Sequence, residues 1–178
     1  STDGVNWNGL GKTVIDSGNG VLWDGSKWFV VGSSTAELPH TMARSTDGVT
    51  WTGFGEDIFD TDAYGIAFNG SRYVAVGSSS DNSIAWSDNG TTWHGLGRTI
   101  LRSGQSISYN TENQLWVAVG STDLTDDGYR PYVMVYSSNG IDWTPVGGSI
   151  TKCQSTAPPG KLLRCPSAIA VIASRLLR

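Results

Sequence analysis

Acidic and aromatic side chains gather in two polar stretches of this 178-residue chain, where they are suited to binding a polar ligand. Binding residues are often carried by variable loops on a regular scaffold. The alternative is that both stretches are ordinary solvated loops. The candidate ligand-binding residues are Asp60, Asp62, Tyr64, Asp123, Asp126, Asp127, Tyr129 and Arg130.

No metal or cofactor is predicted. The three aspartates between residues 123 and 127 offer oxygen ligands for calcium, but their spacing does not match the EF-hand pattern. The two cysteines and the two distant histidines do not make a zinc site; they are Cys153, Cys165, His40 and His94. The cysteines either form one disulfide or remain free thiols.

The sequence does not indicate a set of residues that would come together as a catalytic site. A glycosidase needs two carboxylates held on either side of one bond, and the spacing of Glu37, Glu56 and Glu112 singles out no such pair. His94 directly follows a tryptophan of a structural repeat, so Ser-His-Asp and Cys-His catalysis are weaker candidates still. We therefore expect a protein that is not an enzyme.

The elements that position these side chains are set by a repeated motif. The pattern Ser-x-Asp/Asn-Gly-x-x-Trp, here called the box, occurs four times, and its tryptophans are separated by 44, 42 and 50 residues. A period of about 40–50 residues indicates a repeat architecture in which no unit folds alone. The box residues are Ser1, Asp3, Gly4, Trp7, Ser45, Asp47, Gly48, Trp51, Ser87, Asn89, Gly90, Trp93, Ser137, Asn139, Gly140 and Trp143.

Each repeat predicts four short antiparallel strands. A first strand, expected at 21–23, 66–68 and 107–109, leads through a hairpin turn to a second strand that ends in glycine, and the third and fourth strands flank the next box. Four strands in such a period form a β-propeller blade, so the predicted fold is all-β with about three and a half blades. The predicted blades span 18–59, 62–101 and 104–150, with a lone strand at 5–15.

The box is expected to have a structural role. Its serine and its aspartate or asparagine bond nearby backbone N–H groups, its glycine adopts a conformation that other residues reach at a cost, and its tryptophan buries a large apolar surface. With these boxes the chain resembles the Asp-box (BNR-repeat) β-propeller families, which include sialidases, sortilin-type receptors and photosystem II assembly factors. The resemblance covers residues 1 to about 150, with one residue fewer between aspartate and tryptophan than in the family pattern.

The resemblance implies that the boxes lie away from any active site and that this chain is a non-sialidase member. Sialidases need an arginine cluster, a Tyr–Glu nucleophile pair and an acid–base aspartate. The Phe-Arg-Ile-Pro motif that begins their site is absent, and Tyr129-Arg130-Pro131 resembles it only superficially. Sialidase-like glycoside hydrolysis is therefore a weak alternative.

Antiparallel alternation predicts two different ends for the blades. The hairpin turns and the boxes share one end, which is uniform in sequence. The loops between second and third strands share the other end with the connections between blades. The strand glycine and the box serine on either side of these loops are separated by 13, 10 and 17 positions, which include the third strand. The candidate ligand-binding residues are all predicted at this variable end.

Charge separates the repeats from the tail. Residues 1–150 hold 16 acidic and 7 basic residues, whereas residues 151–178 hold five basic residues and no acidic one. The acidic body argues against a nucleic-acid partner, and the apolar run at 168–173 is too short to span a membrane. We expect the tail to be a closing strand or disordered. Because residue 1 already lies inside a box, we expect the native N-terminus to be missing or processed.

The sequence predicts a non-catalytic scaffold that mediates protein–protein interaction or assembly, as an extracellular component or on a particle surface such as a virion. Regular, sparsely charged blades suit a scaffold, and an open arc of blades exposes faces that invite pairing. We therefore expect a partial chain or an oligomer. The alternative is a lectin-like, carbohydrate-binding module that uses the variable end.

Overall fold

The computed structural model describes residues 1, 3–6, 8–122 and 132–146. These residues contain twelve β-strands, joined by turns and irregular segments, and no helix. The strands pair in antiparallel fashion throughout. They are β1 (Ser17–Trp23), β2 (Trp28–Ser33), β3 (Met42–Ser45), β4 (Thr52–Gly53), β5 (Asp62–Phe68), β6 (Tyr73–Ser78), β7 (Ile84–Ser87), β8 (His94–Gly95), β9 (Ser103–Asn110), β10 (Leu115–Ser121), β11 (Tyr132–Ser137) and β12 (Thr144–Pro145).

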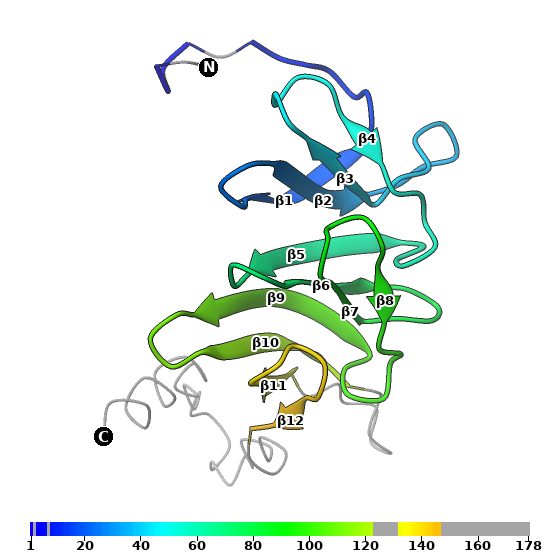
Figure 1. Ribbon diagram of the computed structural model, residues 1–178. Coiled ribbons are helices and arrows are strands. Elements are labelled where there is room, and N and C mark those ends of the chain that lie inside the picture. Colours follow the sequence, from blue (N-terminus) through cyan, green and yellow to red (C-terminus); the bar gives the residue numbers. More distant parts are fainter. Residues whose placement is uncertain (2, 7, 123–131, 147–178) are drawn as a thin grey trace, which may run out of the picture. The chain divides into compact units, whose positions relative to one another are not determined.

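The strands form three four-stranded units in which neighbours along the chain are hydrogen-bonded neighbours (Figure 1). We name them blade I (β1–β4), blade II (β5–β8) and blade III (β9–β12). One pairing between Ser33 and Asp62 joins β2 to β5 and so connects blades I and II. The prediction of all-β, four-stranded antiparallel blades is confirmed.

The predicted lone strand at 5–15 is wrong, because residues 5, 6 and 8–15 form bends and irregular backbone. The outer strands that do form are held by the third strand of their own blade, as β4 is by β3. No described strand pairs with the segment at 5–15, and an extended segment without such a partner does not hold a strand conformation.

The first strand of each blade begins four residues earlier than the sequence predicts, at residues 17, 62 and 103. The added residues are mostly small or polar, and a β-bulge in each strand interrupts the alternation that sequence patterns rely on. As a result, Asp62 and Tyr64 lie inside β5, although they were predicted on a connection between blades.

Neighbouring blades stack through opposite faces. Val31 and Met42 of blade I are buried against Ala75 and Ala85 of blade II, together with Phe59 from the connection between them. Residues directly opposite on paired antiparallel strands share a face, and these pairs are Val31 with Met42 and Ala75 with Ala85. One face of each blade therefore meets the opposite face of the next blade.

Blade II repeats the arrangement on its other face. Val76 and Ile84 are buried against Trp116, Ala118 and Val135 of blade III. Since side chains alternate between the two sides of a strand, Ala75 and Val76 point to different neighbours. Blade II is thus covered on both faces.

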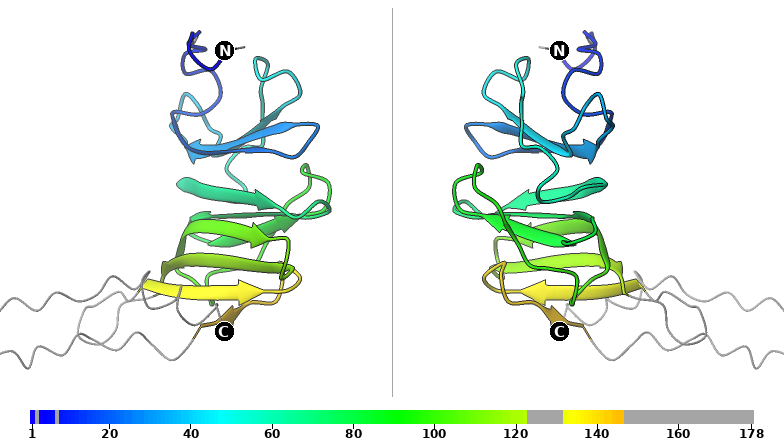
Figure 2. Two further views of the ribbon diagram at one scale, coloured as in Figure 1. Left: turned by 90° about the vertical axis from the view of Figure 1, so that its left-hand side faces the viewer. Right: turned by 90° about the vertical axis from the view of Figure 1, so that its right-hand side faces the viewer.

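The sheets approach one another most closely at their first strands. β5 contacts β1 and β2, and β9 contacts β5 and β6. Figure 2 shows the three sheets one above another in two side views. We call β1, β5 and β9 the inner strands, because they form the edge at which the blades meet.

A glycine near the end of each second strand makes room for the first strand of its own blade and for the segment that enters the blade. A Cβ on Gly77 would lie 2.3 Å from the Asp62 backbone oxygen and 2.9 Å from Phe59 Cδ1. Gly32 meets Ser17 and Ile15 in the same way, and Gly120 meets Ser103 and Leu101. Each glycine therefore receives an apolar side chain from the segment that enters its blade.

We expect Gly77→Ala to destabilise the fold by about 1–3 kcal/mol, because backbone atoms rather than a flexible side-chain tip occupy the space. Gly9→Ala is the matched control, since a Cβ at Gly9 meets nothing within 4 Å. Thermal or denaturant unfolding measures both changes. Equal stability of the two variants would contradict this account of the strand glycines.

Candidate functional site

The four boxes make the same hydrogen bonds. In the box before β4, Ser45 Oγ accepts a bond from the Gly48 N–H at 2.8 Å, while Asp47 Oδ1 accepts bonds from Val49 at 2.8 Å and Thr50 at 2.7 Å. The glycine φ is +73°, which L side chains rarely adopt. The equivalent acceptors in the other boxes are Asp3, Asn89 and Asn139.

Aspartate and asparagine serve equally as acceptors here, because only one side-chain oxygen receives the two backbone bonds. The backbone N–H of Thr50, above other donors, holds the pKa of the Asp47 carboxyl well below its usual range. The backbone N–H of Asn6 has the same effect on the pKa of Asp3. These carboxylates are occupied in holding the turn.

The box tryptophans are covered to different degrees. Trp143 is buried, and Trp51 and Trp93 are half-buried. The Trp93 ring packs near Phe54 and Tyr73, with centroids 6.5 and 6.4 Å apart. Trp93 therefore contributes to the contact between blades I and II, and Trp7 lies outside the described residues.

Arg72 connects three elements at the end that carries the boxes. Its Nε donates to Asp88 Oδ1 at 2.7 Å, its Nη1 donates to the Asn139 backbone oxygen at 2.7 Å, and its guanidinium carbon lies 4.5 Å from the centroid of the Trp86 ring. The β5–β6 turn is thereby joined to the boxes of blades II and III. The box end is a hydrogen-bonded seam between blades.

Asp24 and Tyr73 form a second link across this seam. The Tyr73 hydroxyl donates to Asp24 of the β1–β2 turn, and burial followed by this bond raises the pKa of Tyr73. The hydroxyl consequently stays protonated and keeps its role as a donor.

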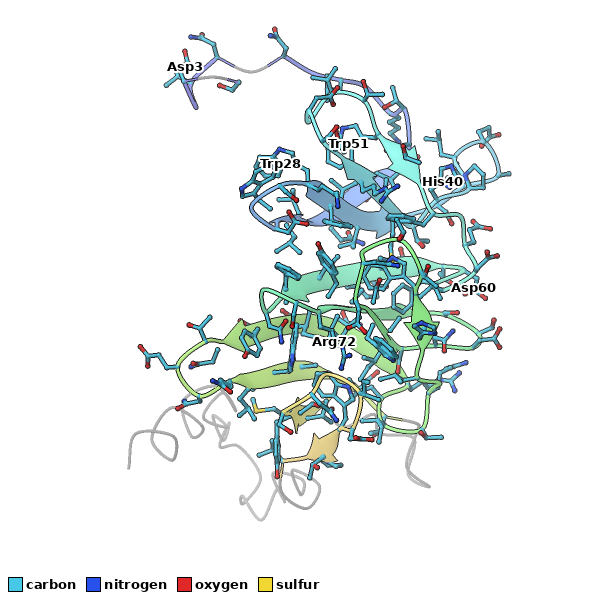
Figure 3. All side chains as sticks on the ribbon, viewed as in Figure 1. Asp3, Trp28, His40, Trp51, Asp60 and Arg72 are labelled. Atoms are coloured by element: carbon cyan, nitrogen blue, oxygen red, sulfur yellow. The ribbon has the colours of Figure 1, made fainter. Side chains whose placement is uncertain are left out.

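The opposite end of the blades carries the candidate Asp60. Its carboxylate accepts bonds from the Ser80 hydroxyl at 2.5 Å and the Ser80 N–H at 3.1 Å, and the hydroxyl bond is the main cause that lowers the pKa of Asp60. Nearby, His40 Nδ1 accepts the Gly55 N–H at 2.9 Å. Figure 3 shows His40 and Asp60 on the right-hand side and Trp28 on the left.

Asp62 and Tyr64 are brought together within β5. Asp62 accepts bonds from the Ser33 hydroxyl of blade I and from the Tyr64 hydroxyl at 3.1 Å. Burial, and then Asp62, raises the pKa of Tyr64. Asp60 bonds a different partner, Ser80.

The other candidates lie outside the described residues; they are Asp123, Asp126, Asp127, Tyr129 and Arg130. Across the described ranges, no group of three or more His, Cys, Asp and Glu side chains is placed to hold a metal ion. Those ranges also contain no helix with the length and apolar character needed to cross a membrane.

Two blade faces differ from their buried counterparts. The sequence predicts that an open arc exposes blade faces, but it does not identify the residues on them, because each strand has the pattern of an ordinary core strand. On blade III, Val119 and Met134 take the positions that Val76 and Ile84 hold on blade II. The blade II pair is buried, whereas the blade III pair is half-buried. We call Val117, Val119, Met134 and Tyr136 the open face of blade III.

On blade I the opposite face is exposed, the one that on blade II packs against the preceding blade. Val21 takes the position of Ile66 on blade II, and it is 64% exposed, while Trp23 beside it is 46% exposed. Ile66 instead packs against the core between blades I and II. We call Val21, Trp23, Trp28 and Val30 the open face of blade I.

Comparisons with known proteins identify the fold. No family model matches the chain, and no curated protein matches it in sequence. The chain resembles a crystal structure of a nidogen/laminin complex, with a TM-score of 0.52 and 16% identity over 75% of this chain and 49% of that one. It also resembles a GH74 enzyme from Niastella koreensis, with a TM-score of 0.51 and 19% identity over 72% of this chain.

The chain spans about half of the first matched structure and 17% of the second. At these identities the likeness concerns the fold alone. Together with the stacked four-stranded sheets, it shows that the described chain is a partial β-propeller, as the sequence predicts.

The box chemistry leads to a pH-dependent prediction. Asp47→Asn keeps the turn acceptor, as Asn89 and Asn139 do, but loses the charge. Because the folded pKa of Asp47 is lowered, its ionisation stabilises the fold above the unfolded pKa of about 3.9, and this contribution is lost as the pH falls through the folded value. Wild type should exceed Asp47→Asn in stability at neutral pH, and the difference should shrink in acid.

Asp47→Ala is the comparison variant, since it removes the acceptor itself and should be the least stable of the three at every pH. Thermal unfolding over a pH series measures all three proteins. Equal losses for the asparagine and alanine variants would contradict the assigned turn chemistry.

Proposed function

We propose that this chain is a non-catalytic, Asp-box type propeller scaffold that associates with protein through its open blade faces. The partner to which the pattern points is a second copy of the chain. In this arrangement the open face of blade III of one copy stacks on the open face of blade I of the next.

The observation that supports this proposal is positional equivalence. Val31 and Val76 are fully buried against the next blade, and Val119 occupies the same position on the open face of blade III. Ile66 and Ile107 pack against the preceding blade, and Val21 occupies their position on the open face of blade I. The two open faces thus repeat the two halves of an interface that the chain already uses twice.

The energetics favour such stacking. Burying apolar surface contributes about 25 cal/mol per Å², and large exposed apolar patches mark interaction sites on soluble proteins. The stacking is head to tail, because the two faces differ. A head-to-tail contact produces a ring if the rotation closes and a chain of copies if it does not.

The proposal also includes a location outside the cell or on a particle surface and the lack of a catalytic activity. The matched nidogen/laminin complex is an assembly of proteins, which supports a role in protein partnering outside the cell or on a particle surface. The described carboxylates that sequence reasoning selected are bonded by protein donors, Asp60 by Ser80 and Asp62 by Ser33 and Tyr64. This occupancy supports a scaffold rather than a glycoside hydrolase.

Light scattering of the purified chain over a concentration series tests the proposal. The particle mass should exceed that of one chain and rise with concentration. Val21→Asp should shift the mass toward the single chain, because it places a charge in the stacked interface.

Val49→Asp is the matched control, since Val49 is also 64% exposed but lies in the turn between β3 and β4 and not on the strands that carry the open faces. It should associate like wild type. A single-chain mass at every concentration, or equal association of Val21→Asp and wild type, would show that the open faces do not assemble copies.

A further inference from the structure

Each inner strand contains one extra residue at the same place in its blade. In β1 the pairing passes from Gly18 to Gly20 and leaves out Asn19. In β5 it passes from Ala63 to Gly65 and leaves out Tyr64. In β9 residues 104 and 106 pair with consecutive residues of β10, so Gln105 is left out. Three blades thus carry the same β-bulge.

The three bulge residues all have hydrogen-bonding side chains. Two carry carboxamides and one carries a phenol. Asn19 and Gln105 are exposed, and Tyr64 is half-buried. A β-bulge turns a side chain out of the regular alternation, and such bulges are frequent beside binding and active sites.

Hydrogen bonds hold each bulge side chain near its own strand or the next inner strand. Asn19 Nδ2 donates to the Ala63 backbone oxygen of β5 at 3.1 Å. Tyr64 donates to Asp62 at 3.1 Å, and Gln105 Nε2 donates to Ser103 Oγ at 3.0 Å. Among the described residues, no donor bonds the amide oxygens of Asn19 and Gln105, so both oxygens keep acceptor capacity.

Glycines bring the inner strands, and hence the bulges, close together. A Cβ on Gly20 would lie 3.5 Å from the Tyr64 backbone oxygen, and a Cβ on Gly65 would lie 3.4 Å from the Ile107 backbone nitrogen. Both distances correspond to ordinary van der Waals contact, so the inner strands lie close together at these positions. The bulge side chains therefore follow one another along the inner edge, from β1 to β5 to β9.

The chemistry of this row suits a ligand rich in hydroxyl groups. A carboxamide offers both donors and an acceptor, and the Tyr64 hydroxyl, whose hydrogen bonds Asp62, offers an acceptor. A sugar hydroxyl is itself both donor and acceptor, and it satisfies such a mixed set. The row contains no lysine or arginine, so it has no cation for a phosphate, sulfate or sialic acid carboxylate.

We propose that Asn19, Tyr64 and Gln105, with Asp62 beside them, form a row along the inner edge that binds a neutral oligosaccharide. Successive sugar units contact successive blades, because the bulges repeat once per blade. This site is separate from the open blade faces, so it can be occupied while copies assemble.

Isothermal titration with maltohexaose, cellohexaose and chitohexaose tests the proposal, with sialyllactose as the anionic comparison. At least one neutral hexasaccharide should bind, and sialyllactose should bind more weakly. Asn19→Ala combined with Gln105→Ala should weaken that binding by about tenfold or more, because two sets of hydrogen bonds are lost. Tyr64→Phe, which keeps the ring and removes only the hydroxyl, should weaken it to a smaller extent.

Asn113→Ala is the matched control, since Asn113 is an exposed amide in the β9–β10 turn, outside the row. It should bind like wild type. All variants should remain folded and keep the solution mass of wild type, which separates this test from that of the open faces. Absence of binding by all three neutral sugars, preference for sialyllactose, or unchanged binding by the double variant would overturn the proposal.

Discussion

Every four-stranded blade of this protein has two apolar faces, and the need to bury both of them governs the rest of the structure. A sheet of short strands cannot cover itself, so blades stack. Blade II meets this requirement fully, with Ala75 toward blade I and Val76 toward blade III. The same positions on the outward sides of blades I and III are less covered, and they are where association is expected.

Stacking also explains features that look unrelated in the sequence. Gly77 must lack a side chain because Phe59 and the Asp62 backbone fill the space above it. The boxes fix the turns so that Arg72 can join blades II and III at one end. The bulges set polar residues along the inner edge, where the blades come closest. Packing, turns and the proposed ligand row thus share one geometric cause.

Local signals predicted most of the fold. The Asp24-Gly25 and Asn69-Gly70 turns and the repeated boxes each act over a few residues, so one sequence reveals them. The bulges were missed because Asn19 and Tyr64 break the period of two on which strand prediction depends. The partners of the site residues were missed as well. Ser33 and Ser80 lie 29 and 20 residues from Asp62 and Asp60, and only the folded chain brings them together.

Cross-linking between copies tests the stacking account most directly. In chains with Cys153 and Cys165 replaced by serine, one copy would carry Val21→Cys and another Val119→Cys, the positions equivalent to Ile66 and Val31 in the buried core. Mild oxidation of the mixture should give a covalent dimer, while a mixture of Val49→Cys and Val119→Cys should not. Equal cross-linking in both mixtures, or none in the first, would contradict head-to-tail stacking of the open blade faces.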